Sequence, residues 1–200
     1  ADKIKLVGMF KECKECAVWN AFGPYLYKNE LFLPRFYVVP NSVLVVGENA
    51  AARQLIYSLM YQNFEPKNTV IIEGTKINDY DADFLKKFSI IFLARDSVDQ
   101  DSIGKLKEYA SHGGLIVPDI VNGQTSVSSE DIDMVLKTTG NYEEINIKEY
   151  SSNKVALDLN GEKGWLVASE RFAYFPGWKA GIDGKGIEIF KANNVISAVY

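Results

Sequence analysis

The cysteines, the single histidine and a glycine turn are the features whose type and spacing could support chemistry in this sequence. Cys13 and Cys16 stand in a C-x-x-C pair, which suits a local disulfide or two free thiols. A structural zinc ion needs four ligands, and only His112 remains to join the two cysteines. His112 precedes Gly113-Gly114, where we expect a helix to end and its dipole to favour a cation. We therefore expect neither a metal ion nor a cofactor.

The glycine turn at Gly47 is placed where nucleotide phosphates bind in some folds, between an expected strand and an expected helix. The G-x-G-x-x-G fingerprint would need glycines where Asn49 and Ala52 stand. Glu48 also places a carboxylate where a phosphate would lie. The turn is therefore interpreted as an ordinary junction between a strand and a helix.

Acidic residues gather at three places, as general acid–base chemistry or a calcium loop would require. The clusters are Asp79, Asp81 and Asp83; Asp96, Asp99 and Asp101; and Glu130, Asp131 and Asp133. Each cluster stands at the start of an expected helix, where Asp caps free N–H groups and favours the helix dipole. We therefore interpret the clusters as helix caps.

The charge and hydropathy patterns exclude two classes of partner for the 200-residue chain as given. The formal net charge is -4 and no cluster of Lys and Arg stands out, so a phosphate-binding nucleic-acid surface is not expected. No apolar run reaches the roughly 18 residues that a membrane span needs. The segment itself is expected to be soluble.

Residues 41–140 alternate between short apolar strands and amphipathic helices, which predicts a parallel sheet with helices on both faces. The expected strands are 42–46, 69–73, 89–94 and 115–118, and the expected helices are 50–62, 81–88, 100–111 and 128–138. Such a layer is flavodoxin-like. The pattern therefore predicts an α/β domain at 41–140.

Residues 141–200 switch to a period of two, which predicts antiparallel strands. The expected strands are 145–150, 154–159, 165–169, 178–182, 187–191 and 195–200. Asp183-Gly184 is typical of a two-residue hairpin turn of the primed type. Further strands are expected at 3–7, 25–27 and 32–39, so residues 1–40 plus 141–200 are predicted to form a β-sandwich or open barrel.

The central part resembles the class I glutamine amidotransferase-like superfamily over a strand, a helix, Gly113-Gly114 and a further strand. In that superfamily a cysteine nucleophile follows the last of these strands. Here Pro118-Asp119-Ile120 fills the turn, without cysteine or serine. A nucleophile also needs a base and an orienting group. The resemblance therefore implies a non-catalytic layer.

Two separated blocks resemble the soluble outer region of YfhO-type polytopic membrane proteins, which are related to the integral-membrane GT-C glycosyltransferases. The first block is Leu26-Tyr27-Lys28-Asn29 with Leu33-Pro34-Arg35-Phe36-Tyr37-Val38-Val39. The second is Leu166-Val167-Ala168-Ser169-Glu170, then Tyr174-Phe175-Pro176-Gly177-Trp178-Lys179-Ala180, Ile182-Asp183-Gly184-Lys185 and Ile187-Glu188-Ile189. The resemblance implies a non-enzymatic domain on the extracytoplasmic face of the cell membrane, anchored through the transmembrane part of the same polypeptide. The partner it implies is carbohydrate or a lipid-linked sugar, in cell-envelope glycosylation.

Three residues are candidates for contact with a carbohydrate or partner: Tyr174, Trp178 and Arg35. The two aromatic rings could stack on a sugar or pack inside the β domain, and Arg35 is expected to pair with a carboxylate such as Glu170. The alternative function is a soluble α/β enzyme or small-ligand protein with its site at the C-terminal ends of the parallel strands. Its candidate residues are Glu48, Asn49, Glu73, Arg95, Asp96 and Asp119. A third reading, an assembly module, would need a large exposed apolar patch.

Overall fold

The computed structural model describes residues 4–9, 25–29, 32–47, 50–62, 65–94, 97–118, 142–159 and 163–200. The chain divides into two compact units, Ala1–Leu33 and Pro34–Tyr200. In the first unit, β1 (Ile4–Met9) pairs antiparallel with β2 (Tyr25–Asn29). These are two of the predicted strands. The cysteine pair and the helix expected at 128–138 lie outside the described residues.

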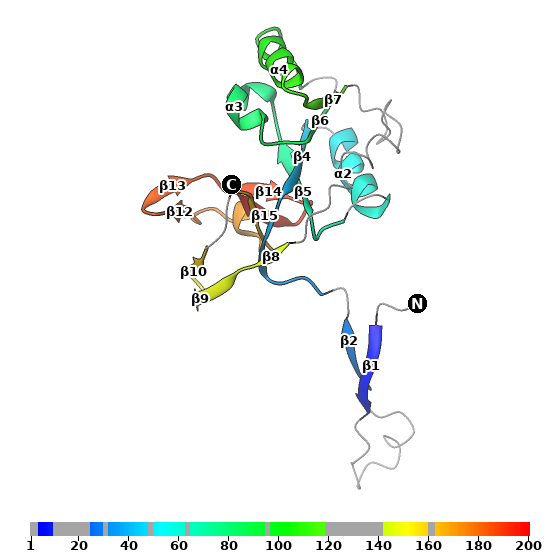
Figure 1. The fold of residues 1–200 in the computed structure, drawn as a ribbon, viewed down its shortest axis with the longest axis vertical. Coiled ribbons are helices and arrows are strands. Elements are labelled where there is room, and N and C mark those ends of the chain that lie inside the picture. Colours follow the sequence, from blue (N-terminus) through cyan, green and yellow to red (C-terminus); the bar gives the residue numbers. More distant parts are fainter. Residues whose placement is uncertain are drawn as a thin grey trace. The chain divides into compact units, whose positions relative to one another are not determined.

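A nine-stranded mixed sheet forms the frame of the second unit, in the order β7-β6-β4-β5-β14-β15-β11-β3-β8 (Figure 1). Its strands are β3 (Phe36–Val39), β4 (Asn41–Val46), β5 (Thr69–Gly74), β6 (Ile90–Leu93), β7 (Leu115–Val117), β8 (Glu143–Glu144), β11 (Trp165–Ala168), β14 (Phe190–Ala192) and β15 (Ile196–Val199). The four strands β4 to β7 are parallel, as predicted, and the others pair antiparallel. The fold is therefore mixed α/β.

The parallel and antiparallel halves meet where β14 pairs with β5, with Ala192 opposite Ile72. Asn193 secures this seam, because its backbone N–H donates to the Ile71 carbonyl and its side-chain oxygen accepts from the Ile71 N–H, both at 2.9 Å. At the other end, β3 pairs with β11, so the expected association of 32–39 with the C-terminal segment is confirmed for Phe36–Val39. The domain boundaries at 40 and 140 stay a prediction.

The sheet coils strongly between β3 and β4. Val39 and Asn41 are two residues apart, so they are separated by at most about 7 Å. Four strands separate β3 from β4 in the sheet order, and a flat sheet would hold them about 24 Å apart, at 4.8 Å for each of five steps. Twist and coiling must therefore bring the two strands together end to end.

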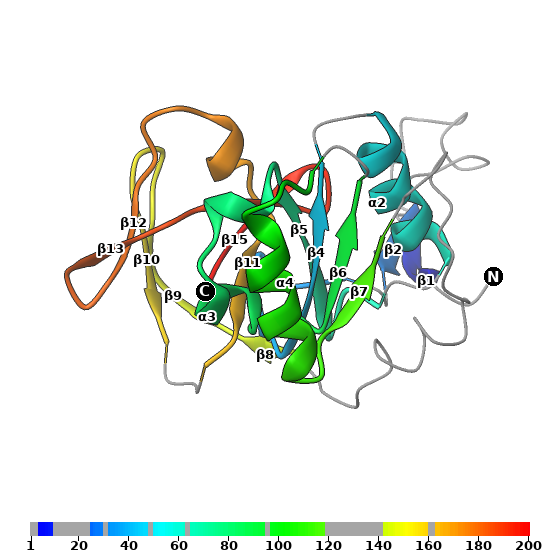
Figure 2. The same ribbon diagram turned by 90° about the horizontal axis from the view of Figure 1, so that it is seen from above.

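Helices cover both faces of the parallel half, as predicted (Figure 2). On one face α2 (Ala50–Gln62) buries Leu55, Ile56 and Leu59 against β-strand side chains such as Val43 and Ile71. The other side carries α3 (Ala82–Leu85) and α4 (Ser102–Ser111). The 3₁₀ turn η1 (Ile77–Asp79) precedes α3 in the chain. The predicted bounds of α2 are confirmed, whereas α3 and α4 are shorter than predicted.

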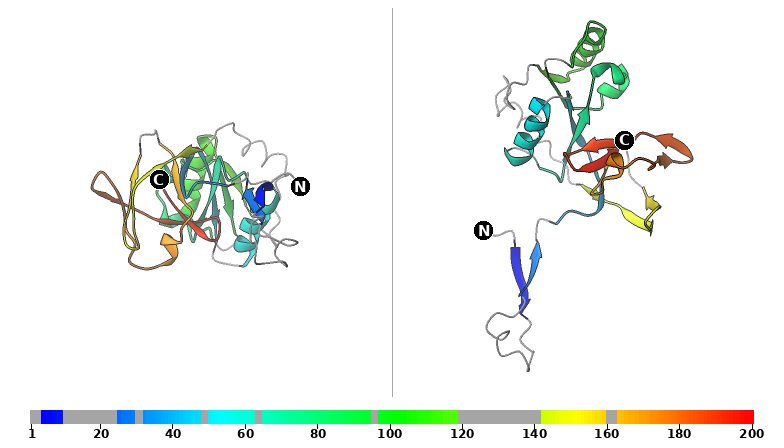
Figure 3. Two further views of the ribbon diagram at one scale, coloured as in Figure 1. Left: turned by 90° about the horizontal axis from the view of Figure 1, so that it is seen from below. Right: turned by 180° about the vertical axis from the view of Figure 1, so that it is seen from behind.

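Two β-hairpins lie over the antiparallel half. One is β9 (Asn146–Tyr150) with β10 (Val155–Asp158), and the other is β12 (Ala180–Ile182) with β13 (Lys185–Ile187) (Figures 2 and 3). Between β11 and β12 the chain makes a 3₁₀ turn, η2 (Phe172–Tyr174). Asp183 and Gly184 both have positive φ, at 50° and 79°, as a primed hairpin turn requires.

An aromatic core lies on the face of β11 that carries Trp165. The Trp165 ring is 1% exposed and packs against Phe84, Phe88, Phe190 and Tyr200, with centroids 5.3–6.0 Å apart. The tryptophan that fills this core is therefore Trp165, and Trp178 is only partly buried. The strand expected at 178–182 begins at Ala180, which leaves Trp178 in the preceding loop.

Candidate functional site

The predicted contact between Arg35 and Glu170 is present, at 3.2 Å between Arg35 Nε and Glu170 Oε1. It follows from strand pairing, because the N–H of Ser169 donates to the Arg35 carbonyl at 2.8 Å, just beyond the β3–β11 ladder. This bond holds the residues that flank the two strands side by side. The two side chains can therefore meet at the shared end of these paired strands.

Tyr150 completes a triad with this ion pair. Its hydroxyl donates to Glu170 Oε1 at 2.8 Å, and Arg35 Cζ lies 4.6 Å from the centroid of its ring. The hydrogen bond to Glu170 raises the pKa of Tyr150 above its ordinary value, because it favours the protonated hydroxyl. The carboxylate therefore has two fixed partners, and half of the Arg35 side chain, 51%, stays exposed to donate elsewhere.

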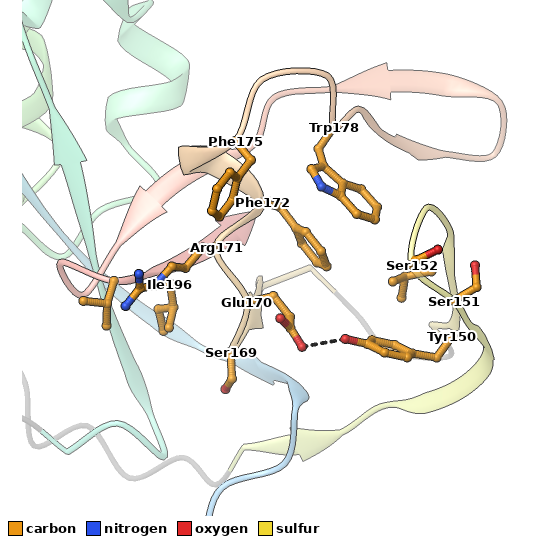
Figure 4. A pocket seen from close by; sticks show the side chains of 12 residues that line it. Tyr150, Ser151, Ser152, Ser169, Glu170, Arg171, Phe172, Phe175, Trp178 and Ile196 are labelled. Atoms are coloured by element: carbon orange, nitrogen blue, oxygen red, sulfur yellow. Dashed lines mark hydrogen bonds between the residues drawn. The ribbon is translucent and has the colours of Figure 1, made fainter.

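An open cleft of about 570 Å³ lies beside this triad, and we call it the Trp178 cleft. Its lining includes Tyr150, Ser151, Ser152, Glu170, Phe175 and Trp178. Figure 4 shows the Phe175 and Trp178 rings at one end, the two serines at the side, and the bond between Tyr150 and Glu170 below them. Aromatic faces and hydrogen-bonding groups thus line the same hollow.

Local backbone geometry places the aromatic end of the cleft. The η2 turn presents Phe172, whose ring lies 4.4 Å from that of Trp178 at an interplanar angle of 42°. Between them, Gly177 has φ of 102°, a conformation that a residue with a Cβ rarely adopts. The turn at Pro176-Gly177 therefore reverses the chain and leaves the Phe175 side chain 59% exposed.

Tyr174 has a structural position, outside the lining of the Trp178 cleft. Its hydroxyl donates to Glu73 Oε1 at 3.0 Å, and the same oxygen accepts the N–H of Asn194 at 2.8 Å. Burial is the main cause that raises the pKa of Tyr174, and the Glu73 carboxylate adds to it. Of the three sequence candidates, the structure brings Arg35 and Trp178 to the cleft region and ties Tyr174 to β5.

The residues proposed for an α/β cleft are Glu48, Asn49, Arg95, Asp96 and Asp119, and all five lie outside the described residues. Glu73 is the exception, and both of its contacts named above are structural. His112 caps the C-terminus of α4, as expected, with Nδ1 2.8 Å from the Glu108 carbonyl oxygen. The described part of the chain therefore offers no support for a catalytic site around these residues.

No family model, curated protein or solved structure matches this chain. The helices of the described segments are all too short or too polar to cross a membrane. Those segments also contain no group of three His, Cys, Asp or Glu side chains that could hold a metal ion.

Sequence reasoning missed most of the cleft. Tyr150, Ser151 and Ser152 lie at the end of a hairpin strand, and their types give no sign that they face Trp178. Phe175 belongs to the aromatic block at 174–178, but only Tyr174 and Trp178 of that block were predicted to contact a ligand. The one sequence feature that could have located the cleft was the predicted contact of Arg35 with Glu170, because Glu170 lines it.

Proposed function

We propose that this chain is a non-enzymatic, extracytoplasmic domain of a larger membrane protein and that it recognises carbohydrate in the Trp178 cleft, as an accessory to cell-envelope glycosylation. One observation carries the carbohydrate part. The partly exposed ring of Trp178 and the exposed ring of Phe175 share one open cleft with the fixed contact of Tyr150 and Glu170.

A sugar offers apolar C–H faces and a ring of hydroxyl groups, and both have partners here. The aromatic rings supply apolar faces in a loop whose turn is fixed by Gly177. Glu170 can accept hydrogen bonds from sugar hydroxyls, and Ser151 and Ser152 line the same cleft. Because Arg35 and Tyr150 already hold Glu170, little side-chain freedom is lost on binding.

The small number of carboxylates in the cleft supports the proposal that the domain is non-enzymatic. Glycoside hydrolysis uses two carboxyl groups on either side of the bond that breaks. Among the described residues that line the cleft, Glu170 is the one carboxylate, and it is ion-paired. This lining is suited to binding and lacks the second group that the chemistry needs.

Attachment to a membrane and the extracytoplasmic location rest on the resemblance to YfhO-type proteins. The test is the hydropathy profile of the complete parent polypeptide. Hydrophobic spans before and after this segment are expected. A parent polypeptide with no spans would overturn this part of the proposal and leave the carbohydrate part standing.

The strand order supports a flavodoxin-like assignment for the parallel half, which we include in the proposal. Numbered along the chain, β5-β4-β6-β7 is the order 2-1-3-4, which is how the first four strands of a flavodoxin-like sheet are arranged. On the other side of β5 the sheet continues antiparallel into β14.

The carbohydrate proposal is tested by calorimetric titration of the purified chain with glucose, galactose, N-acetylglucosamine and their oligomers. At least one saccharide is expected to bind. Trp178→Ala should then weaken binding about tenfold, or ~1.4 kcal/mol. Tyr61→Ala is the matched control, because Tyr61 is 87% exposed on α2 and does not line the cleft. Equal binding by both variants, or no binding by the parent chain, would overturn the proposal.

A further inference from the structure

A second hollow adjoins the Trp178 cleft, and we call it the apolar groove. It has a volume of about 350 Å³ and lies between β10, the β12–β13 hairpin and the sheet strands β11 and β15. Its walls include Leu157, Leu159, Leu166, Ile182, Ile187 and Val199. Ligand pockets in proteins start at about 300 Å³, so the groove is large enough for a small ligand.

The wall of the groove has few polar side chains, and one of them is already satisfied. The hydroxyl of Ser197 donates to the Glu170 carbonyl at 2.8 Å and accepts the N–H of Ala173 at 2.9 Å. Lys179 is the charged side chain in the lining, and the described part of the chain gives it no ion pair. The groove is thus an apolar trough with one cation.

The mouth of the groove leaves apolar side chains in water. Ile182 and Leu159 are 38% and 39% exposed, although both belong to the lining. Covering such side chains stabilises a complex by about 25 cal/mol for each Å² removed from water. The occupant is therefore expected to be apolar along most of its length.

The layer geometry limits the width of that occupant. The β9–β10 hairpin packs on the sheet through Val155 and Leu157, which contact the cluster of Phe36, Ile145 and Ala168. Two packed β layers lie about 10 Å apart, which leaves room for one layer of side chains or one extended alkyl chain.

We propose that the apolar groove binds a free fatty acid, with its single alkyl chain along Leu157, Leu166 and Ile187 and its carboxylate at the Lys179 ammonium. The charge of Lys179 selects an anionic head group over a cationic one. The groove shares Val155, Phe172 and Trp178 with the Trp178 cleft. The side chains that the proposal uses, Leu157, Leu166, Lys179 and Ile187, line the groove and not the cleft.

The first test is calorimetric titration of the chain with octanoate, decanoate and dodecanoate below their micellar concentrations. Each added methylene should tighten binding roughly threefold to fourfold until the groove is full. Dodecyltrimethylammonium, which has the same chain and the opposite charge, should bind at least tenfold more weakly than dodecanoate. Failure of dodecanoate to bind, or equal binding of the cation, would overturn the proposal.

Two variants place the ligand in the groove. Lys179→Glu should reverse the preference, so that the cation binds more tightly than dodecanoate, whereas Lys185→Ala on β13 should change neither affinity.

Ile187→Trp should fill the groove and abolish binding of both probes, with circular dichroism confirming the fold. If Ile187→Trp fails to fold, Lys179→Glu still tests the proposal, because it changes an exposed side chain and should leave the fold intact. Unchanged dodecanoate binding in Lys179→Glu would overturn the proposal. Saccharide binding should persist in Lys179→Glu, so the two proposals can fail independently.

Discussion

Glu170 Oε1 accepts the hydroxyl of Tyr150 at 2.8 Å while Nε of Arg35 lies 3.2 Å from the same oxygen. Three separate segments of the chain therefore converge on one atom: the residue before β3, the end of β9 and the loop after β11. This convergence fixes one wall of the Trp178 cleft. A change that removes the charge of Glu170 is therefore the most direct test of this wall.

Glu170→Gln should weaken saccharide binding about fivefold and leave the fold nearly unchanged. The amide removes the charge that strengthens hydrogen bonds to the ligand, whereas an exposed ion pair contributes only about 0–1 kcal/mol to stability. Titration calorimetry and urea unfolding measure the two effects. A loss of stability well above this range, with binding unchanged, would show that Glu170 serves the fold alone.

Tyr174→Phe should lower stability by about 1.5 kcal/mol and leave saccharide binding unchanged. The change removes the hydroxyl that donates to Glu73, a charged acceptor. Tyr61→Phe, at an exposed site on α2, is the control and should be neutral. A tenfold loss of saccharide affinity in Tyr174→Phe would instead place Tyr174 at the ligand.

Gly177→Ala should destabilise the chain by about 1–3 kcal/mol. A Cβ at this position meets no atom within 4 Å, so the cost comes from the backbone, whose φ is 102°. Gly186→Ala is the matched control, since its added Cβ also meets nothing and its φ is not positive. Thermal unfolding of the two variants distinguishes backbone strain from crowding by the added Cβ. Equal melting temperatures would contradict the assignment to backbone strain.

Stability should fall at alkaline pH through Tyr37, because burial raises the pKa of its hydroxyl to about 12. The folded chain holds this proton more tightly than the unfolded chain, whose tyrosines titrate near 10. The contribution is therefore complete below about pH 10 and is lost between pH 10 and 12, at about 1.4 kcal/mol for each pH unit. Urea unfolding between pH 8 and 12 measures the slope. Tyr37→Phe should lower the slope by about that amount and leave the contributions of Tyr80, Tyr109 and Tyr174, whose pKa values are also raised. An unchanged slope would contradict the assignment.

Local patterns predicted the elements well where one face is apolar throughout. Helix α2 has the predicted bounds because Leu55, Ile56 and Leu59 recur at helical spacing. The strand expected at 178–182 begins two residues late, because Trp178 and Lys179 lie in the loop between the turn at Pro176-Gly177 and β12. Propensity places strands well and their ends less well.

The sheet order and most of the cleft could not be predicted from the sequence. The pairing of Ala192 with Ile72 depends on contacts between distant segments, and nothing local in either strand specifies the partner. Tyr150 reads as an ordinary exposed strand residue, and only the folded hairpin brings it to Glu170. Arg35 was the exception, since its contact with Glu170 was predicted and is present.

The seam between β5 and β14 has a consequence for the order in which the chain folds. β5 is complete at Gly74, but its partner on this side, Phe190–Ala192, is synthesised only near the end of the segment. Until then β5 presents an unpaired edge that another chain can join. Contacts between such distant segments also slow folding. Fragments that stop before Phe190 are therefore expected to aggregate, even though they contain every helix and parallel strand named above.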